Sequence, residues 1–298
     1  IIKSKLPSQF DKINIINNFS KKNNIFKKVQ NLNVILASKI YNLINEDNSK
    51  VNNSYSYQKI LLEFSVFLEP KMDISKYALA EIYTFEKTYK TAFRILDTIP
   101  EESFFSLPAN LKKLDIIKSS SMNIKYKTLL FKMTNVWPDN KFVLYRLANY
   151  YKSKLLFHKS LKIYKKILDH YDSNDRDLFL YASNLDKLGR WKEARVLFLE
   201  LLKKNPRDTF TLNYVSYKLA LKNQELELAL DLIKKALIID PNNGYFLDTL
   251  GWVEYKRNNF NSAVYFLEKS VSILPRSAEV IDHLGDCYFM LNRRKEAL

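Results

Sequence analysis

Proline recurs in this chain of 298 residues at intervals close to multiples of 34 residues. The prolines concerned are Pro70, Pro138, Pro206, Pro241 and Pro275, and the intervals between them are 68, 68, 35 and 34 residues. Proline lacks the backbone N–H that an α-helix needs and restricts the residue before it, so it marks places where helices end. A helix-ending residue on a fixed lattice predicts a repeat array and disfavours a single globular core.

Each interval contains two amphipathic segments that are separated by a short polar break. The expected repeat starts are Met72/Asp73, Leu107, Lys141, Asp175, Thr209, Gly244 and Ala278, with one extra residue near 223–227. The clearest block runs from Gly244 to Pro275; its first segment presents Leu247, Leu250 and Gly251, and its second presents Phe260, Ala263, Leu267 and Ser270. The pattern predicts helical hairpins that bury their apolar faces against their neighbours.

These blocks resemble the tetratricopeptide repeat, a helix–turn–helix of 34 residues. In the block from Asp175 the matching residues are Leu178, Tyr181, Ala182, Leu185, Gly189, Trp191, Ala194, Phe198, Leu201 and Pro206. The resemblance implies an all-α fold, a right-handed superhelical solenoid of stacked hairpins.

Small residues recur at two kinds of position in these blocks. Ala80, Ala148, Ala182, Gly251 and Gly285 are expected where the two helices of a hairpin approach closely. Gly189, Asn223, Asn258 and Asn292 are expected in the turn, where a residue must tolerate positive φ.

The lattice divides the chain into three parts. Residues 1–30 form a polar segment rich in Lys and Asn, residues 31–72 form a degenerate hairpin with an insertion near 46–53, and residues 73–298 form the array. The repeat from Leu107 is degenerate because Lys113 and Leu114 replace the small pair, and the last repeat is cut short.

The order of the blocks also resembles a tetratricopeptide family of alphaproteobacteria. Two stretches carry this resemblance, Asp248-Thr249-Leu250-Gly251-Trp252 and Ile281-Asp282-His283-Leu284-Gly285-Asp286. The resemblance implies no defined biochemical activity.

The chain is strongly basic, with 48 Lys and Arg against 32 Asp and Glu and a net charge of +16. Such an excess is compatible with nucleic acid, an anionic membrane surface or an acidic partner. Lys and Asn are abundant together, and no Arg-rich patch alternates with aromatic residues, so we favour a compositional bias over nucleic-acid binding. No run of 18 apolar residues predicts a transmembrane helix.

The sequence offers little for catalysis, and we expect neither an enzyme nor a cofactor. Its 4 Gly do not have the spacing of a phosphate-binding loop, and its single Cys and 3 His cannot complete a typical zinc site. His283 and Cys287 share a helix face, and we interpret them as ordinary packing residues.

The resemblance implies that the first helix of each repeat lines a concave face through its positions 2, 5, 9, 12 and 13. The candidate peptide groove consists of Phe142, Tyr145, Asn149, Lys152, Arg176, Phe179, Phe210, Asn213, Tyr217, Tyr245, Asp248, Trp252, Tyr255 and Lys256. Aromatic residues of this kind anchor many protein interfaces. The carboxylate clamp of chaperone-binding relatives is not expected, because Tyr145, Asn149 and Phe179 do not match it.

We therefore predict a non-catalytic scaffold that binds a protein or peptide. Two alternatives stay open, an RNA-binding repeat protein and the repeat arm of a larger enzyme. The chain begins with Ile1, so its true N-terminus is expected to be missing, and both a cytoplasmic and a periplasmic location are compatible with it. Further domains before Ile1 or after Leu298, the oligomeric state and the identity of the partner are left open.

Overall fold

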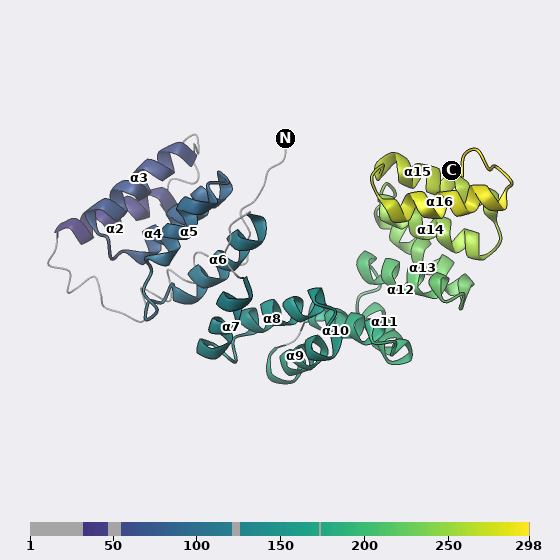
Figure 1. The fold of residues 1–298 in the computed structure, drawn as a ribbon, viewed down its shortest axis with the longest axis horizontal. Helices are drawn as coiled ribbons and strands as arrows, with labels where there is room; N and C mark the ends of the chain where they lie inside the picture. The colour runs from purple at the N-terminus through teal and green to yellow at the C-terminus, as the bar shows by residue number, and fades with distance from the viewer. Residues whose placement is uncertain (1–31, 47–54, 121–125, 173, 298) are drawn as a thin grey trace. The chain divides into compact units, whose positions relative to one another are not determined.

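A computed structural model of the chain describes residues 32–46, 55–120, 126–172 and 174–297, and every regular element in them is an α-helix (Figure 1). The chain divides into two compact units, Ile1–Trp137 and Pro138–Leu298. The predicted fold class, all-α with stacked helical hairpins, is confirmed. The polar segment 1–30 and most of the insertion expected near 46–53 lie outside the described residues.

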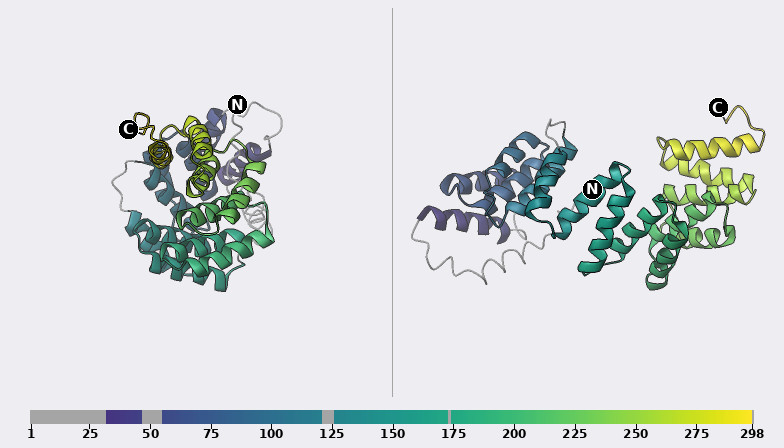
Figure 2. Two further views of the ribbon diagram at one scale, coloured as in Figure 1. Left: turned by 90° about the vertical axis from the view of Figure 1, so that its right-hand side faces the viewer. Right: turned by 60° about the horizontal axis from the view of Figure 1, so that its bottom comes forward.

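Unit 1 contains α2 (Leu32–Glu46), α3 (Tyr55–Leu68), α4 (Asp73–Phe85), α5 (Tyr89–Asp97), α6 (Ser106–Ser119) and α7 (Tyr126–Val136). Unit 2 contains α8 (Lys141–Ser153), α9 (Phe157–His170), α10 (Asp175–Lys187), α11 (Trp191–Lys204), α12 (Thr209–Leu221), α13 (Leu226–Ile239), α14 (Gly244–Lys256), α15 (Phe260–Ile273) and α16 (Ala278–Met290). Within unit 2, hairpins that follow one another in sequence also lie next to one another in space (Figure 2).

The helices of unit 2 have two constant lengths. The first helices α8, α10, α12, α14 and α16 have 13 residues each, and the second helices α9, α11, α13 and α15 have 14. Three residues separate the helices of a hairpin, except that four separate α12 from α13. This extra residue lies in the predicted interval, and Glu225 there has a φ of 43°.

The turn within each hairpin requires a left-handed residue. Gly189, Asn223, Asn258 and Asn292 all have positive φ, as predicted. Lys87 and Leu155 occupy the same register with φ of 60° and 58°, although neither residue type favours this conformation. The spacing of these turns shows that the hairpin geometry is imposed by packing even where the local residue opposes it.

Four of the five first helices of unit 2 begin at a residue whose side chain caps them. The side chains of Asn140, Asn174, Asp208 and Asn243 each accept hydrogen bonds from backbone N–H groups of the first turn of α8, α10, α12 and α14. The unpaired N–H groups of a helix start need such partners. The caps therefore help to fix where each repeat begins.

Gly251 permits the close approach of α14 and α15. A Cβ at this position would lie 2.5 Å from Leu267 Cγ and 3.2 Å from the carbonyl oxygen of Ala263, so no larger residue fits without movement. The same prediction for Gly285 is wrong, because a Cβ there would only reach ordinary contact, 3.5 Å from the oxygen of Ala297. The described residues after α16 form turns and supply no second helix to approach it.

The second helices bury large side chains at one repeated position. Tyr164, Phe198, Ile233 and Leu267 occupy the eighth residue of α9, α11, α13 and α15, and each is fully buried. Small residues stand at the fourth position, Ser160, Ala194, Ala229 and Ala263, and they are also fully buried. This alternation interlocks each hairpin with the next, and stacking carries the stability of the unit.

Unit 1 departs from this regularity in its last hairpins. Helix α5 has 9 residues and α7 has 11. Lys113 and Leu114 are buried where the other repeats have a bulky residue followed by a small one, and the Lys113 ammonium lies 2.9 Å from Asp97 Oδ1. Both residues of this pair are thus packed inside the unit. A small pocket lies between the two helices of this hairpin, α6 and α7.

Candidate functional site

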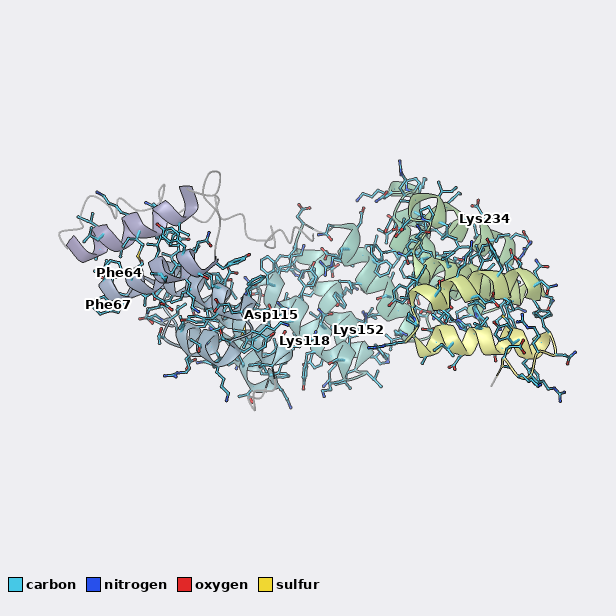
Figure 3. All side chains as sticks on the ribbon, turned by 90° about the horizontal axis from the view of Figure 1, so that it is seen from above. Phe64, Phe67, Asp115, Lys118, Lys152 and Lys234 are labelled. Carbon is cyan, nitrogen blue, oxygen red and sulfur yellow. The ribbon has the colours of Figure 1, made fainter. Side chains whose placement is uncertain are left out.

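The candidate site is the inner face of unit 2, which we define as positions 2, 5, 9, 12 and 13 of the first helices α8, α10, α12, α14 and α16. Side-chain contacts join α8 to α10 through Tyr145 and Asp177, and α10 to α12 through Asp186 and Tyr214. Helix α14 packs against both α12 and α16, so the same positions recur along one face of the unit. Lys152 of α8, labelled in Figure 3, stands at position 12 of this face.

Position 2 is the most exposed part of the inner face. Phe142, Phe210 and Tyr245 are 47%, 78% and 60% exposed, and Arg176 is also exposed. Aromatic side chains that stay exposed on neighbouring helices offer flat apolar surface to a ligand. The structure therefore presents these four predicted residues to solvent.

Other predicted residues are held by partners inside the unit. The Tyr145 hydroxyl donates to Asp177, a fully buried carboxylate that also pairs with Lys141 at 2.9 Å. Phe179 packs edge-on against Phe198 of its own repeat and against Tyr214 of the next one, with ring centroids 5.3 Å and 5.4 Å apart. These contacts make Tyr145 and Phe179 part of the packing between repeats, with only their remaining surface on the inner face.

Trp252 is buried, which differs from its predicted role as an exposed anchor. Its ring stacks on Tyr255 and on His283, with centroids 4.7 Å and 4.0 Å away, and only 7% of the residue is exposed. The ammonium of Lys256 lies 4.5 Å from the Trp252 ring centroid. Asp248 is also buried, and its Oδ1 lies 2.9 Å from Nδ1 of His283.

Tyr217 explains why this end of the face is closed. Its hydroxyl, on α12, donates to Glu279 of α16 at 2.5 Å and so passes over the intervening helix α14. Burial and this hydrogen bond raise the pKa of Tyr217, so the phenol stays protonated. Side chains from α12, α14 and α16 thus close the face around Trp252. This closure depends on how the stacked repeats curve, which the sequence pattern of one repeat does not reveal.

The α8–α12 end of the face contains two asparagines, one of them with a buried oxygen that has no partner. Asn213 Oδ1 on α12 is a buried atom with no hydrogen-bond partner in the structure. Asn149 is exposed and accepts a hydrogen bond from the Tyr164 hydroxyl at 3.0 Å. A buried amide oxygen without a donor is costly, and a ligand N–H would remove that cost.

Two lysines give this end its charge. Burial lowers the pKa of Lys152, and the nearby ammonium of Lys187 lowers it further. Neither lysine forms an ion pair with a described carboxylate. The neighbouring acid Asp186 is already neutralised, because Lys218 lies 2.8 Å away and the Tyr214 hydroxyl donates to it at 2.9 Å. The sequence alone did not single out the Lys152–Lys187 pair.

Nucleophilic and metal chemistry have little support. Cys287 is fully buried, and burial raises the pKa of its thiol to about 12, which keeps it protonated. His283 is engaged by Asp248 and Trp252, as a packing residue would be. Within the described ranges, His, Cys, Asp and Glu form no group of three or more that could hold a metal ion.

No described helix is long and apolar enough to span a bilayer.

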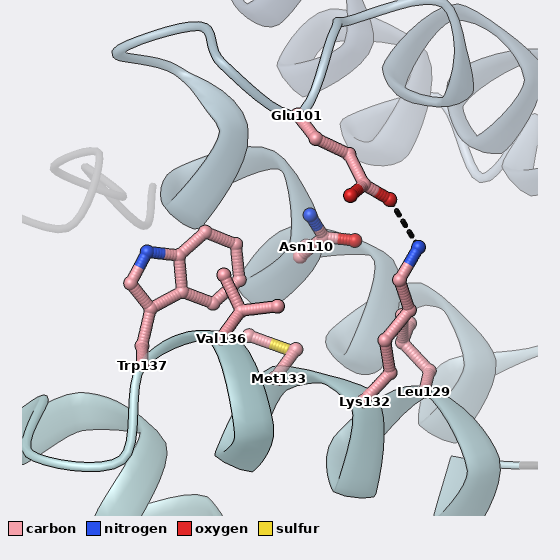
Figure 4. A pocket seen from close by; sticks show the side chains of 7 residues that line it. All are labelled: Glu101, Asn110, Leu129, Lys132, Met133, Val136 and Trp137. Carbon is pink, nitrogen blue, oxygen red and sulfur yellow. Dashed lines mark hydrogen bonds and ion pairs between the residues drawn. The ribbon is translucent and has the colours of Figure 1, made fainter.

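Unit 1 contains a small pocket of about 20 Å³ between α6 and α7. It is lined by Glu101, Asn110, Leu129, Lys132, Met133, Val136 and Trp137. Figure 4 shows the Glu101–Lys132 ion pair on one side and the Trp137 indole on the other.

Comparison with known proteins identifies the repeat. Residues 178–208 match the family profile of the tetratricopeptide repeat. A TPR repeat-containing protein of Methanocaldococcus jannaschii is 34% identical over 113 residues, which are 37% of this chain and 19% of that protein. A TPR repeat-containing protein of Pseudomonas aeruginosa is 23% identical over 181 residues, 60% of this chain and 30% of that protein. This chain thus spans less than a third of these relatives.

The crystal structure of yeast Tom70 has the same fold, with a TM-score of 0.56 at 17% identity over 82% of this chain and 53% of that one. The resemblance to an alphaproteobacterial family stays a prediction, since neither relative tests it. Residues 178–208 therefore match the tetratricopeptide repeat, and the stacked hairpins around them share the fold of Tom70.

Proposed function

We propose that the chain is a non-catalytic scaffold that binds a peptide segment of a partner protein on the inner face of α8, α10 and α12. Helical repeat scaffolds of the tetratricopeptide type are typical of protein–protein interaction. The observation that carries the proposal is the unpartnered Asn213 oxygen beside exposed aromatic side chains. An extended peptide supplies both a backbone N–H for the amide oxygen and apolar side chains for the rings.

The charge of this end favours an acidic peptide. Lys152 is half-buried, close to Lys187 and without a described carboxylate partner, so its ammonium is less stable than one in water. A ligand carboxylate would supply the missing counter-charge. Charge-assisted hydrogen bonds of this kind are shorter and stronger than neutral ones.

The role of the other predicted groove residues follows from their burial. Trp252 and Asp248 form the closed wall at the α14–α16 end. We propose that they limit how far a peptide extends along the face. Phe142, Phe210 and Arg176 then contact the ligand, and Tyr145 and Phe179 support them from behind.

Fluorescence anisotropy with three labelled decapeptides, one acidic, one neutral and one basic, tests the proposal. The acidic peptide should bind best, and Lys152→Ala with Lys187→Ala should weaken it about tenfold, the worth of one charge-assisted hydrogen bond. Asn213→Ala should weaken the acidic and neutral peptides alike. The matched control is Lys162→Ala with Lys165→Ala on the outer side of α9, where both lysines are exposed and the charge change is the same.

A single-stranded RNA probe separates the main alternative. If the chain binds this RNA, and both the inner-face and the α9 double variants weaken that binding equally, the binding is nonspecific attraction to nucleic acid. Its affinity would then fall with salt, and the peptide proposal would be wrong. Loss of peptide binding in the α9 control alone would also contradict the proposed face.

A further inference from the structure

Helix α3 carries an apolar stripe that the described residues of unit 1 leave exposed. Tyr57, Ile60, Phe64 and Phe67 are 57%, 62%, 50% and 78% exposed. The rings of Phe64 and Phe67 lie against each other with centroids 6.4 Å apart, and both are labelled at the edge of unit 1 in Figure 3. Their spacing places all four on one side of the helix.

The same four positions are polar in α9, and no second helix of unit 2 has apolar residues at all four of them. Helix α9 has 14 residues, as α3 has, and its corresponding residues are Lys159, Lys162, Lys166 and Asp169. The inward side of α3 is buried in the same way as that of α9. Leu62 and Ser65 are buried at the positions that Tyr164 and Ile167 occupy in α9. The stripe is therefore a feature of the outer side of α3 and is not a displaced core.

The spacing of the four residues is the same in both directions along the helix. Its intervals are 3, 4 and 3 residues, so it is symmetric about residue 62. When two α3 helices pair antiparallel around a two-fold axis, Tyr57 of one faces Phe67 of the other, and Ile60 faces Phe64. Intervals of 3 and 4 residues are those by which helices interlock along a seam, and a two-fold interface requires such self-complementarity.

The charge of α3 also permits self-association. The chain carries +16, so most surfaces of two copies repel each other. Helix α3 has one Lys and one Glu: Lys59 pairs with Glu86 at 2.7 Å, and Glu63 accepts a hydrogen bond from Tyr83 at 2.5 Å. The stripe is thus flanked by balanced charges that already have partners.

The exposed area suits a reversible contact. A large aromatic side chain has roughly 150–250 Å² to bury, so the exposed parts of these four side chains sum to roughly 500 Å². Two copies would remove about 1,000 Å² from water, which is near the lower limit for a specific interface.

We infer that α3 is a homodimerisation helix, which pairs antiparallel with α3 of a second copy through Tyr57, Ile60, Phe64 and Phe67. The pairing involves unit 1 and is independent of the peptide site proposed for unit 2. A contact of this size is that of a reversible dimer, so the state of the chain should depend on its concentration.

Sedimentation velocity of the whole chain over a hundredfold range of concentration tests the inference. The wild type should shift from monomer to dimer, and Phe64→Glu with Phe67→Glu should weaken the dimer more than tenfold. The control is Val196→Glu with Ile238→Glu, which changes exposed apolar residues at the positions of α11 and α13 that match Ile60 and Phe67. It should dimerise as the wild type does. A wild type that stays monomeric, or a dimer that the α3 variant leaves unchanged, overturns the inference.

Crosslinking tests the antiparallel register without a disruptive substitution. A short bismaleimide should join Tyr57→Cys to Phe67→Cys in a mixture of the two proteins. It should not join Tyr57→Cys to itself, because those positions would lie about 15 Å apart along the helix pair. The native Cys287 is fully buried and does not interfere. Efficient self-crosslinking of Tyr57→Cys would contradict the register.

Discussion

The helical hairpins have constant lengths in unit 2 and variable lengths in unit 1. The two units also differ in the residue that stands where the helices of a hairpin approach each other. In unit 2, Gly251 lets α14 and α15 meet so closely that a Cβ would be 2.5 Å from Leu267. In unit 1, the fully buried Leu114 stands at the corresponding position of α6, and the second helix of that hairpin, α7, has only 11 residues. A small residue therefore accompanies the close approach of α14 and α15, and a bulky one accompanies the degenerate hairpin of α6 and α7.

The largest effect should come from the interlocking position of unit 2. Phe198→Ala removes a fully buried ring and should lower the free energy of unfolding by about 3–5 kcal/mol. Phe210→Ala, at a residue 78% exposed in the same unit, should change it by less than about 0.5 kcal/mol. Chemical denaturation of both variants measures the difference. Equal losses would show that stacking does not carry the stability of unit 2.

A pair of glycine variants tests the role of close approach. Gly251→Ala should destabilise by about 1–3 kcal/mol, because the added methyl group meets Leu267 and the backbone of Ala263. Gly285→Ala has room and should stabilise α16 by up to about 1 kcal/mol through helix propensity. Thermal unfolding of the two variants side by side gives the sign of each. The comparison fails if both variants change stability in the same direction.

Exchanging Leu and Asn between two left-handed turn positions tests how much the turn residue contributes to stability. Leu155 has a φ of 58° and is 74% exposed, so Leu155→Asn should relieve backbone strain and stabilise by about 1 kcal/mol. Asn223→Leu, at the same register, should destabilise by a similar amount. Urea titrations measure both. Two changes of the same sign would mean that the turn residue does not control the hairpin.

The smallest effect concerns pH. The pKa of Lys152 is lowered in the folded chain by burial and by Lys187, so the unfolded chain binds more protons between the folded pKa and the usual 10.5. Stability should therefore rise slightly with pH in that window. Lys152→Met should remove this contribution, which is measured by unfolding the two proteins at several alkaline pH values. A Lys152→Met variant with an unchanged pH profile would contradict the assigned burial.

The sequence predicted the hairpins well because the constraints on them are local. The lattice of prolines, the turn residues Asn223 and Asn258 and the close contact at Gly251 all act through neighbours within one repeat. Leu155 and Lys87 were missed, because in these turns packing overrides the preference of the residue. Gly285 was misjudged, since its small size matters only when a second helix packs on it.

The candidate site was harder to predict, because it depends on curvature across several repeats. Trp252 stands at an inner position, yet His283 and Tyr255 stack on it and Tyr217 reaches past it to Glu279. Trp252→Ala would therefore test packing and not ligand binding. The unpartnered oxygen of Asn213 required coordinates, since whether an amide finds a donor depends on residues distant in sequence.

Hydrogen exchange of the chain with and without the acidic decapeptide tests the proposed peptide face most directly. The account predicts slower exchange in α8, α10 and α12, with α9, α11 and the buried α14 wall unchanged. Because the chain also carries an excess of outer lysines, nonspecific charge attraction would slow exchange on α9 instead. Protection confined to the outer helices, or no protection at a saturating peptide concentration, would contradict the proposed face.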